Sequence, residues 1–287
     1  MKLTAKINKY LKNKLRGGEV NERGNRYENY FATFRILELI NNSPTLTKSI
    51  YLSSQEIAFV DDLLIKVDQE RELYQLKSSK KLKWGFGKKI KTLNFDFSIQ
   101  RGIENFHKRN FKLFLTVSND SLRNDLNDSL PKHLKKCTKI ILFPYYDSIQ
   151  KQIENDSKFK NELIKLSAIN SPTTDKLESL AATVLGAWNS SNKKMIQLED
   201  LYTKIENIGY SFIKARVIKN ITVETKSVLD SIPGFKYIIS NNYLTWEYKN
   251  DSGFIPYQIG SNEFNIIEEK IKIENPKNFI TLEKILY

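Results

Sequence analysis

The sequence predicts an α/β protein: a mixed sheet flanked by helices, followed by a mainly helical region with a short C-terminal β-hairpin. Three observations support this prediction. Segments with helical and with strand periodicity alternate over the first 150 residues. From about residue 148 the periodicity becomes mainly helical. Apolar residues make up 40% of the 287 residues, which is enough for a sizeable core and excludes general disorder.

The first 45 residues predict two helices joined by a loop. Residues 1–16 have apolar positions at helical spacing and many lysines, so we expect a short basic helix there. Three glycines within 17–25 predict a loop. From Tyr27 to Leu37 apolar side chains recur at helical intervals, and the second half of this segment is apolar nearly all round. We therefore expect a buried helix over 27–40.

Two strands that form a hairpin are predicted next. Residues 57–67 are apolar on both faces, which is typical of a central strand. After a polar turn at 68–71, residues 72–78 are expected to return beside them. The remaining elements of this part alternate between helix and strand, over 96–108, 111–117, 122–136 and 139–145.

The second half is expected to consist mainly of helices. One helix begins near Asp175, which forms a capping-box-like pattern with Glu178. Another covers 198–208 and ends at Gly209. Residues 235–248 have the pattern of a hairpin. We place the domain boundary between a first part, 1–166, and an accessory region, 167–287, that would regulate the protein or bind a partner.

Charge and cysteine content restrict the class of protein. Lys and Arg exceed Asp and Glu by 46 to 33, which gives a net charge of +13. This excess favours a polyanionic partner, with nucleic acid ahead of an acidic membrane surface, although a lysine-rich surface that only binds water is the alternative. The single cysteine excludes an internal disulfide and Cys-based zinc sites, and it fits a reducing cytoplasm. No apolar run is long enough to span a bilayer, so we expect no membrane association.

Two adjacent aspartates are the strongest candidates for a chemical site. Asp61 and Asp62 are predicted to lie inside an apolar strand, where an unpaired carboxylate costs several kcal/mol. Gln75 and Lys77 share one face of the return strand, because side chains alternate between faces. A tight hairpin would bring this face beside one of the two aspartates. Carboxylate, amide and carbonyl oxygens suit Mg²⁺, and a lysine can orient or deprotonate an attacking water.

The sequence around these residues resembles the PD-(D/E)xK nuclease superfamily. The segments RGNRYE (23–28), VDDLLI (60–65) and YQLKS (74–78) resemble most closely the D-QxK endonuclease domains of bacterial anti-phage effectors, including CBASS effector nucleases. The resemblance covers about half of the chain. It implies a restriction-endonuclease-like mixed sheet and Mg²⁺-dependent cleavage of double-stranded DNA that leaves a 5′-phosphate, with Mn²⁺ as an alternative ion.

Positions that match the family motif are assigned the following roles by the resemblance. The implied catalytic residues are Glu28, Asp62, Gln75 and Lys77. The implied metal ligands are Asp62, Gln75, the Leu76 carbonyl and Glu28, with Asp61 as the alternative aspartate. We favour Asp62, because in the family the ligand is usually followed at once by apolar strand residues. Glutamine replaces the usual acidic residue of the motif at position 75, which lowers the negative charge available to a metal.

A basic stretch over 80–91 follows the predicted site directly. It holds six lysines together with aromatic residues and glycines, so we expect it to bind DNA phosphates and to place an aromatic ring against sugar or base. A solvated, flexible loop is the alternative interpretation. The predicted DNA-binding residues are Lys80, Lys81, Lys83, Trp84, Lys88, Lys89 and Lys91.

Two hypotheses follow for the function. The first is a cytoplasmic, metal-dependent endonuclease that cleaves double-stranded DNA as the effector of an anti-phage defence system. Such an enzyme needs control, so we expect a homo-oligomer or a partner sensor protein. The second is a catalytically inactive nucleic-acid-binding or assembly subunit that keeps the fold and the positive charge.

Overall fold

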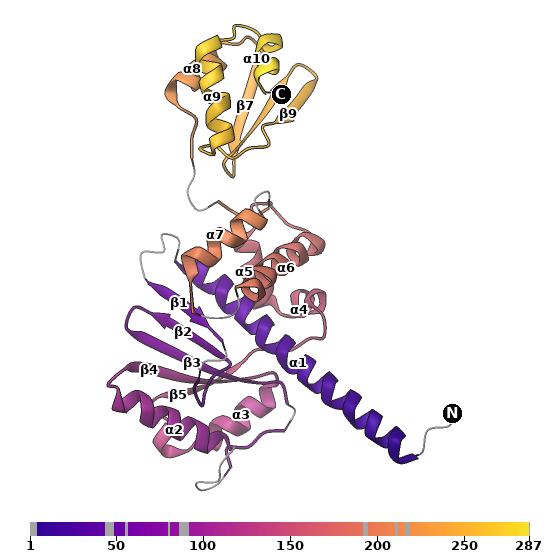
Figure 1. Ribbon diagram of the computed structural model, residues 1–287, viewed down its shortest axis with the longest axis vertical. Coiled ribbons are helices and arrows are strands. Elements are labelled where there is room, and N and C mark those ends of the chain that lie inside the picture. Colours follow the sequence, from indigo (N-terminus) through magenta and orange to yellow (C-terminus); the bar gives the residue numbers. More distant parts are fainter. Residues whose placement is uncertain are drawn as a thin grey trace. The chain divides into compact units, whose positions relative to one another are not determined.

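The computed structural model describes residues 5–43, 49–54, 57–79, 81–85, 92–191, 195–209, 212–215 and 219–286, with the backbone alone over 5–20. The chain forms two compact units, residues 1–212 and residues 213–287 (Figure 1). The predicted boundary at 166–167 therefore falls inside the first unit, where the helices that follow it pack against the helices before it.

A six-stranded mixed sheet forms the centre of the first unit and confirms the predicted fold class. The strand order is β5-β4-β3-β2-β1-β6. Strand β3 pairs antiparallel with β2 and parallel with β4, and β4 pairs parallel with β5. The strands are β1 (Ile50–Ser53), β2 (Leu63–Val67), β3 (Glu70–Lys77), β4 (Asn110–Val117), β5 (Thr138–Leu142) and β6 (Ile196–Gln197).

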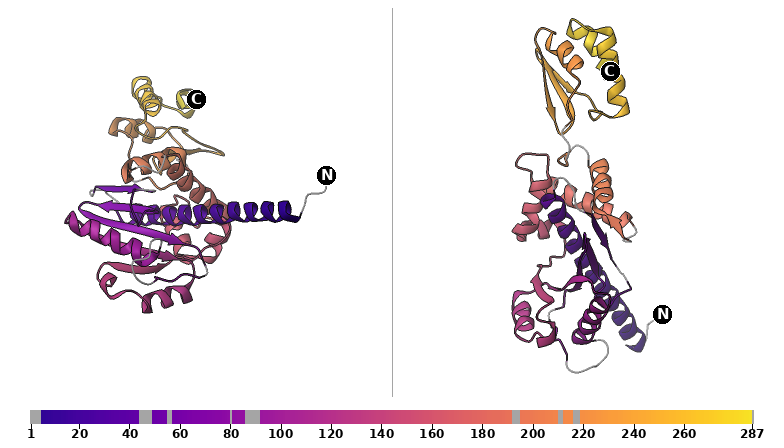
Figure 2. Two further views of the ribbon diagram at one scale, coloured as in Figure 1. Left: turned by 60° about the horizontal axis from the view of Figure 1, so that its bottom comes forward. Right: turned by 90° about the vertical axis from the view of Figure 1, so that its left-hand side faces the viewer.

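Helices cover both faces of this sheet (Figures 1 and 2). On one face α2 and α3 enclose a core that includes Leu64, Leu73 and Phe97. On the other face Phe31 and Phe34 of α1 pack against Tyr74 and Phe143. The helices are α1 (Ala5–Asn42), α2 (Leu93–Phe106), α3 (Asp120–Asp128), α4 (Ile149–Asn155), α5 (Ser157–Leu166), α6 (Thr174–Ser190) and α7 (Leu198–Ile208), with a short 3-10 turn at Lys132–Leu134.

The N-terminal helix differs from the prediction. Helix α1 is continuous from Ala5 to Asn42, so the predicted loop over 17–25 is wrong. Packing of the segment after Tyr27 fixes the helix, and each further residue then adds one hydrogen bond at little cost. A helical glycine costs only about 1 kcal/mol relative to alanine, which such propagation can offset.

The predicted central strand is also shorter than expected. Strand β2 begins at Leu63, so Asp61 and Asp62 come immediately before the strand and not within it. A two-residue turn at Asp68–Gln69 joins β2 to β3, with Asp68 in the left-handed region at φ +52°. The predicted hairpin is therefore confirmed, but the aspartates lie where the two strands separate.

The second unit is a small α/β structure. Three helices cover one face of a three-stranded antiparallel sheet, and the core between them includes Phe235, Trp246 and Phe279. The predicted hairpin is present, with Asn241 and Asn242 at its turn in left-handed conformations. The elements are α8 (Val223–Asp230), β7 (Phe235–Ser240), β8 (Tyr243–Tyr248), β9 (Asp251–Phe254), α9 (Asn262–Glu274) and α10 (Phe279–Leu286). Across the described parts of both units, no helix is long and apolar enough to cross a membrane.

Candidate active site

Four of the residues predicted for the site meet where β2 begins and β3 ends. The Asp62 N–H donates to the carbonyl of Tyr74 at 3.1 Å, although Tyr74 is already paired with Leu63, so the regular register ends at Leu63 and Asp62 is held beside the end of β3. The Asp62 Oδ2 atom accepts hydrogen bonds from Gln75 Nε2 at 2.5 Å and from the Leu76 N–H at 2.6 Å. Lys77 Nζ lies 3.8 Å from the same oxygen. The structure therefore selects Asp62, and not Asp61, as the aspartate beside Gln75 and Lys77, as we expected.

The Asp62 carboxylate is largely shielded from water. Its side chain is 15% exposed, while that of Lys77 is 38% exposed and reaches solvent. Burial raises the pKa of Asp62 above its ordinary value, whereas Lys77 and the two hydrogen bonds from Leu76 and Gln75 partly oppose this increase. Asp61 adds a smaller repulsive contribution. A cation beside Asp62 would therefore relieve an unfavourable burial of charge.

The backbone carbonyl of Leu76 is available on the same side of β3. Within a strand, the N–H and C=O of one residue point to the same side. Because the Leu76 N–H points to Asp62, its carbonyl also points towards the gap in front of β2. The Asp62 carboxylate, the Gln75 amide and the Leu76 carbonyl thus lie at one place, and the nitrogen of the Gln75 amide faces Asp62.

A buried hydrogen-bond network supports the segment before Asp62. The Phe59 N–H donates to Gln100 Oε1 of α2 at 2.9 Å, and Gln100 Nε2 donates to Glu104 Oε1 at 2.8 Å. Glu104 is fully buried and is paired with Arg71 at 3.3 Å and with Arg109 at 3.5 Å. This network attaches the segment that carries the aspartates to α2, and it fixes the approach of Asp62 to β3.

Asp96 is an additional acidic group near the site that sequence reasoning did not identify. It lies in the first turn of α2, and the adjacent Phe95 ring contacts the Phe59 ring at 6.0 Å. Burial raises the pKa of Asp96, Asp61 raises it further, and Lys77 lowers it. Asp61 and Lys77 are therefore close enough to Asp96 for their charges to influence its pKa. No sequence motif marks this residue, because the contact depends on how α2 packs.

Glu28 lies on the other side of the sheet from Gln75 and Lys77. It is half-buried on α1, which contacts the face of β3 from which Tyr74 projects. On the same helix, Arg23 Nη2 donates to the carbonyl of Ser78 at 3.1 Å, directly after Lys77. Helix α1 therefore runs past the end of β3. The role of Glu28 as a metal ligand stays a prediction.

Arg23 is a second residue near the site that the prediction did not include. Its guanidinium also lies over the Tyr145 ring at 5.2 Å, and the side chain is exposed. Among the described side chains no carboxylate pairs with Arg23, whereas Arg26 pairs with Glu22. A guanidinium carries five N–H donors, so Arg23 can bind an anion while it holds Ser78. Arg23 is the first residue of the segment 23–28, which resembles the nuclease family, and this position could have identified it from the sequence.

The predicted DNA-binding stretch is only partly described. Lys81 and Lys83 are exposed, and their role in binding phosphates stays a prediction. Trp84 is 4% exposed, donates its Nε1–H to the Leu126 carbonyl at 2.9 Å and packs against Phe97. The prediction that Trp84 contacts DNA is therefore wrong, since its ring belongs to the core. Lys80, Lys88, Lys89 and Lys91 lie outside the described residues.

The donor set fits Mg²⁺ in its chemistry but is small. Asp62, Gln75 and the Leu76 carbonyl are hard oxygen donors, as Mg²⁺ prefers, and this ion commonly keeps several waters when few protein ligands are present. Within the described residues, no group of three or more Asp, Glu, His or Cys side chains could hold a metal ion. The fit therefore depends on one carboxylate and two neutral oxygens.

Among known proteins, this chain matches solved structures but no family model or curated sequence. Similar solved structures include the Acinetobacter baumannii Cap4 SAVED/CARF-domain containing receptor with the cyclic trinucleotide 3′3′3′-cAAA, at 11% identity and a TM-score of 0.40 over 73% of this chain and 48% of that one. The Moraxella osloensis Cap4 receptor matches at 14% identity and a TM-score of 0.39, over 69% and 50% of the two chains. The chain thus spans about half the length of these receptors.

Proposed function

We propose that this protein is a metal-dependent endonuclease that cleaves double-stranded DNA. The observation that carries the proposal is the convergence of Asp62, Gln75, Leu76 and Lys77 around one buried carboxylate oxygen. Such an arrangement combines oxygen ligands for a divalent cation with a lysine that reaches solvent. We assign the enzyme to an anti-phage defence system, because the segments 23–28, 60–65 and 74–78 resemble the endonuclease domains of such effectors.

Each residue of the cluster has a separate task in the proposed hydrolysis. Bound Mg²⁺ supplies positive charge that polarises the scissile phosphate. Asp62, Gln75 and the Leu76 carbonyl would hold this ion, and Glu28 would contribute through a water. Lys77 would position the attacking water and stabilise the charge that develops on the phosphate. Water adds to phosphorus as the bond to the 3′-oxygen breaks, which leaves a 5′-phosphate and a 3′-hydroxyl.

The distribution of charge between the units supports DNA binding by the first one. Residues 213–287 contain ten Lys or Arg and nine Asp or Glu, so the first unit carries +12 of the net +13. Arg23, Lys81 and Lys83 are exposed on this unit, and Arg23 lies beside the end of β3. These residues would bind phosphates on either side of the cleaved bond.

A catalytically inactive DNA-binding subunit is the second candidate. The small number of acidic ligands favours it, because no described cluster of three such groups could hold a metal. Both candidates predict that the protein binds duplex DNA, and only the enzyme predicts that Mg²⁺ converts supercoiled plasmid to nicked and linear forms. Binding without any Mg²⁺- or Mn²⁺-dependent cleavage, at protein in excess over plasmid, would establish the inactive subunit. A cyclic trinucleotide should be tested as an added activator, since solved Cap4 receptors bind such ligands.

A further inference from the structure

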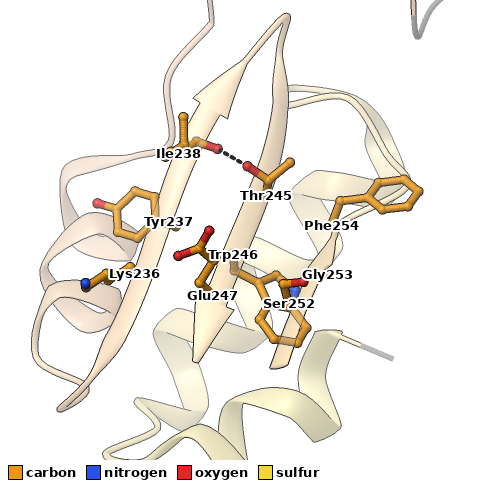
Figure 3. Close-up of a pocket in the computed structure, with 9 residues that line it drawn as sticks. All are labelled: Lys236, Tyr237, Ile238, Thr245, Trp246, Glu247, Ser252, Gly253 and Phe254. Atoms are coloured by element: carbon orange, nitrogen blue, oxygen red, sulfur yellow. Dashed lines mark hydrogen bonds between the residues drawn. The ribbon is translucent and has the colours of Figure 1, made fainter. Parts of the chain in front are cut away.

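The second unit presents one bare face of its sheet. Helices α8, α9 and α10 pack against the face that carries Phe235 and Trp246. The opposite face carries the alternate residues of the three strands, and the close-up in Figure 3 views it with the helices behind the sheet. A shallow hollow of about 570 Å³ lies on this face.

Two exposed apolar side chains lie on the two outer strands of this face. Ile238 of β7 and Phe254 of β9 are 67% and 55% exposed. Both lie in one row across the sheet, because Thr245 of β8 is opposite Ile238 on one side and Phe254 on the other. Leaving two large apolar side chains in water on a regular surface is unfavourable, and such patches commonly mark interaction sites.

The next row supplies one charge of each sign. Lys236 is directly opposite Glu247 in the β7–β8 register, and Ser252 follows on β9. No described ion pair involves either charged residue. Two copies of this surface are complementary to each other, because the lysine of one copy can pair with the glutamate of the other.

The geometry points to a second copy of this chain as the occupant of the face. We propose that two copies associate through it around a twofold axis that runs along the strands between β7 and β8. This symmetry places Lys236 of each copy opposite Glu247 of the other, and Ile238 of each copy opposite Thr245 of the other. The second unit is nearly neutral, with a net charge of +1, so a nucleic acid is a poor occupant. The proposal concerns assembly and does not depend on the proposed nuclease activity.

Sedimentation of the full chain at several concentrations tests the proposal. The wild type should form a dimer, and Ile238→Glu should raise the dimer dissociation constant by at least about tenfold, because a charge would then be buried in the contact. Ile273→Glu is the matched control, since Ile273 is 80% exposed on α9, on the covered side of the sheet. A wild type that stays monomeric, or equal effects of the two variants, would overturn the proposal. Circular dichroism confirms that each variant is folded.

Charge reversal provides a second, independent test. Lys236→Glu and Glu247→Lys should each weaken the dimer, because each puts like charges opposite one another across the axis. The double variant restores both pairs with exchanged signs and should associate about as tightly as the wild type. Single variants that associate normally, or a double variant that stays as weak as the single ones, would show that these residues do not meet across a twofold axis.

Discussion

Substitutions of Asp62 can separate the architecture of the site from its chemistry. In the structure, Asp62 Oδ2 accepts from Gln75 Nε2 and from the Leu76 N–H. Asp62→Ala leaves both donors without this acceptor, and an orphaned buried donor costs about 1–3 kcal/mol. The free energy of unfolding of the first unit should fall by about 2–4 kcal/mol. Asp62→Asn keeps one oxygen in the same place, so its unfolding free energy should stay within about 1 kcal/mol of the wild type or exceed it.

The pH dependence of the free energy of unfolding shows whether the charge on Asp62 stabilises or destabilises the fold. Burial raises the pKa of Asp62 in the folded state, whereas the unfolded chain has the ordinary value near 4. The folded state therefore holds the proton to higher pH, and stability due to this group is lost as pH rises from the ordinary value through the raised one. Asn does not titrate. Below the ordinary pKa of an aspartate, the difference in unfolding free energy between Asp62→Asn and the wild type should be constant. As pH rises from the ordinary pKa through the raised pKa, the wild type should lose stability relative to Asp62→Asn.

Urea denaturation of the three proteins between about pH 3 and pH 7 measures both effects. Asp62→Asn should remain folded like the wild type at neutral pH, while Asp62→Ala should unfold at lower urea. Equal destabilisation by the two substitutions would show that the contacts to Oδ2 are not made. A wild type that gains stability over Asp62→Asn as pH rises would show that the charged carboxylate is favoured in the fold, contrary to the electrostatic reasoning.

Three further substitutions test other parts of the account. Lys77→Ala should reduce the rate of plasmid cleavage more than about 100-fold while the Tm and DNA affinity change little, because the side chain is 38% exposed and acts on the phosphate; a loss below tenfold would place the chemistry elsewhere. Replacing Lys83, Lys88 and Lys89 together by alanine should flatten the dependence of log K on log[salt] by up to about 2.7, and an unchanged slope would place DNA binding on another surface. Gly24→Ala should raise the free energy of unfolding by about 0.5–1 kcal/mol, because an added Cβ meets no atom within 4 Å apart from the backbone of its own helix, and a loss of stability would contradict the continuous helix α1.

The hairpin and the contacts of Asp62 could be predicted from local patterns. Strand alternation places Gln75 and Lys77 on one face, and a short turn brings this face beside the residues before Leu63. The resemblance favoured Asp62 over Asp61, and the contacts show that Asp62 is the aspartate beside Gln75 and Lys77, while its role as a metal ligand stays a prediction.

Other features depended on packing that local patterns do not encode. The glycines at 17, 18 and 24 predicted a loop, but the packed segment after Tyr27 extends the helix through them. Trp84 lies in a lysine-rich stretch and still enters the core, because its indole finds an acceptor in Leu126. Asp96 and Arg23 lie near the site only because α2 and α1 pack against the sheet as they do.

The most direct test of the proposed enzyme is the rate at which it nicks supercoiled plasmid in Mg²⁺, with wild type and Asp62→Asn purified in parallel. The account predicts cleavage by the wild type that EDTA abolishes, and a rate for Asp62→Asn that is lower by at least about 100-fold, or about 2.7 kcal/mol in the barrier, although the variant is folded. Equal rates for the two proteins would show that the nuclease activity comes from another site or from a contaminant, and would contradict the central claim.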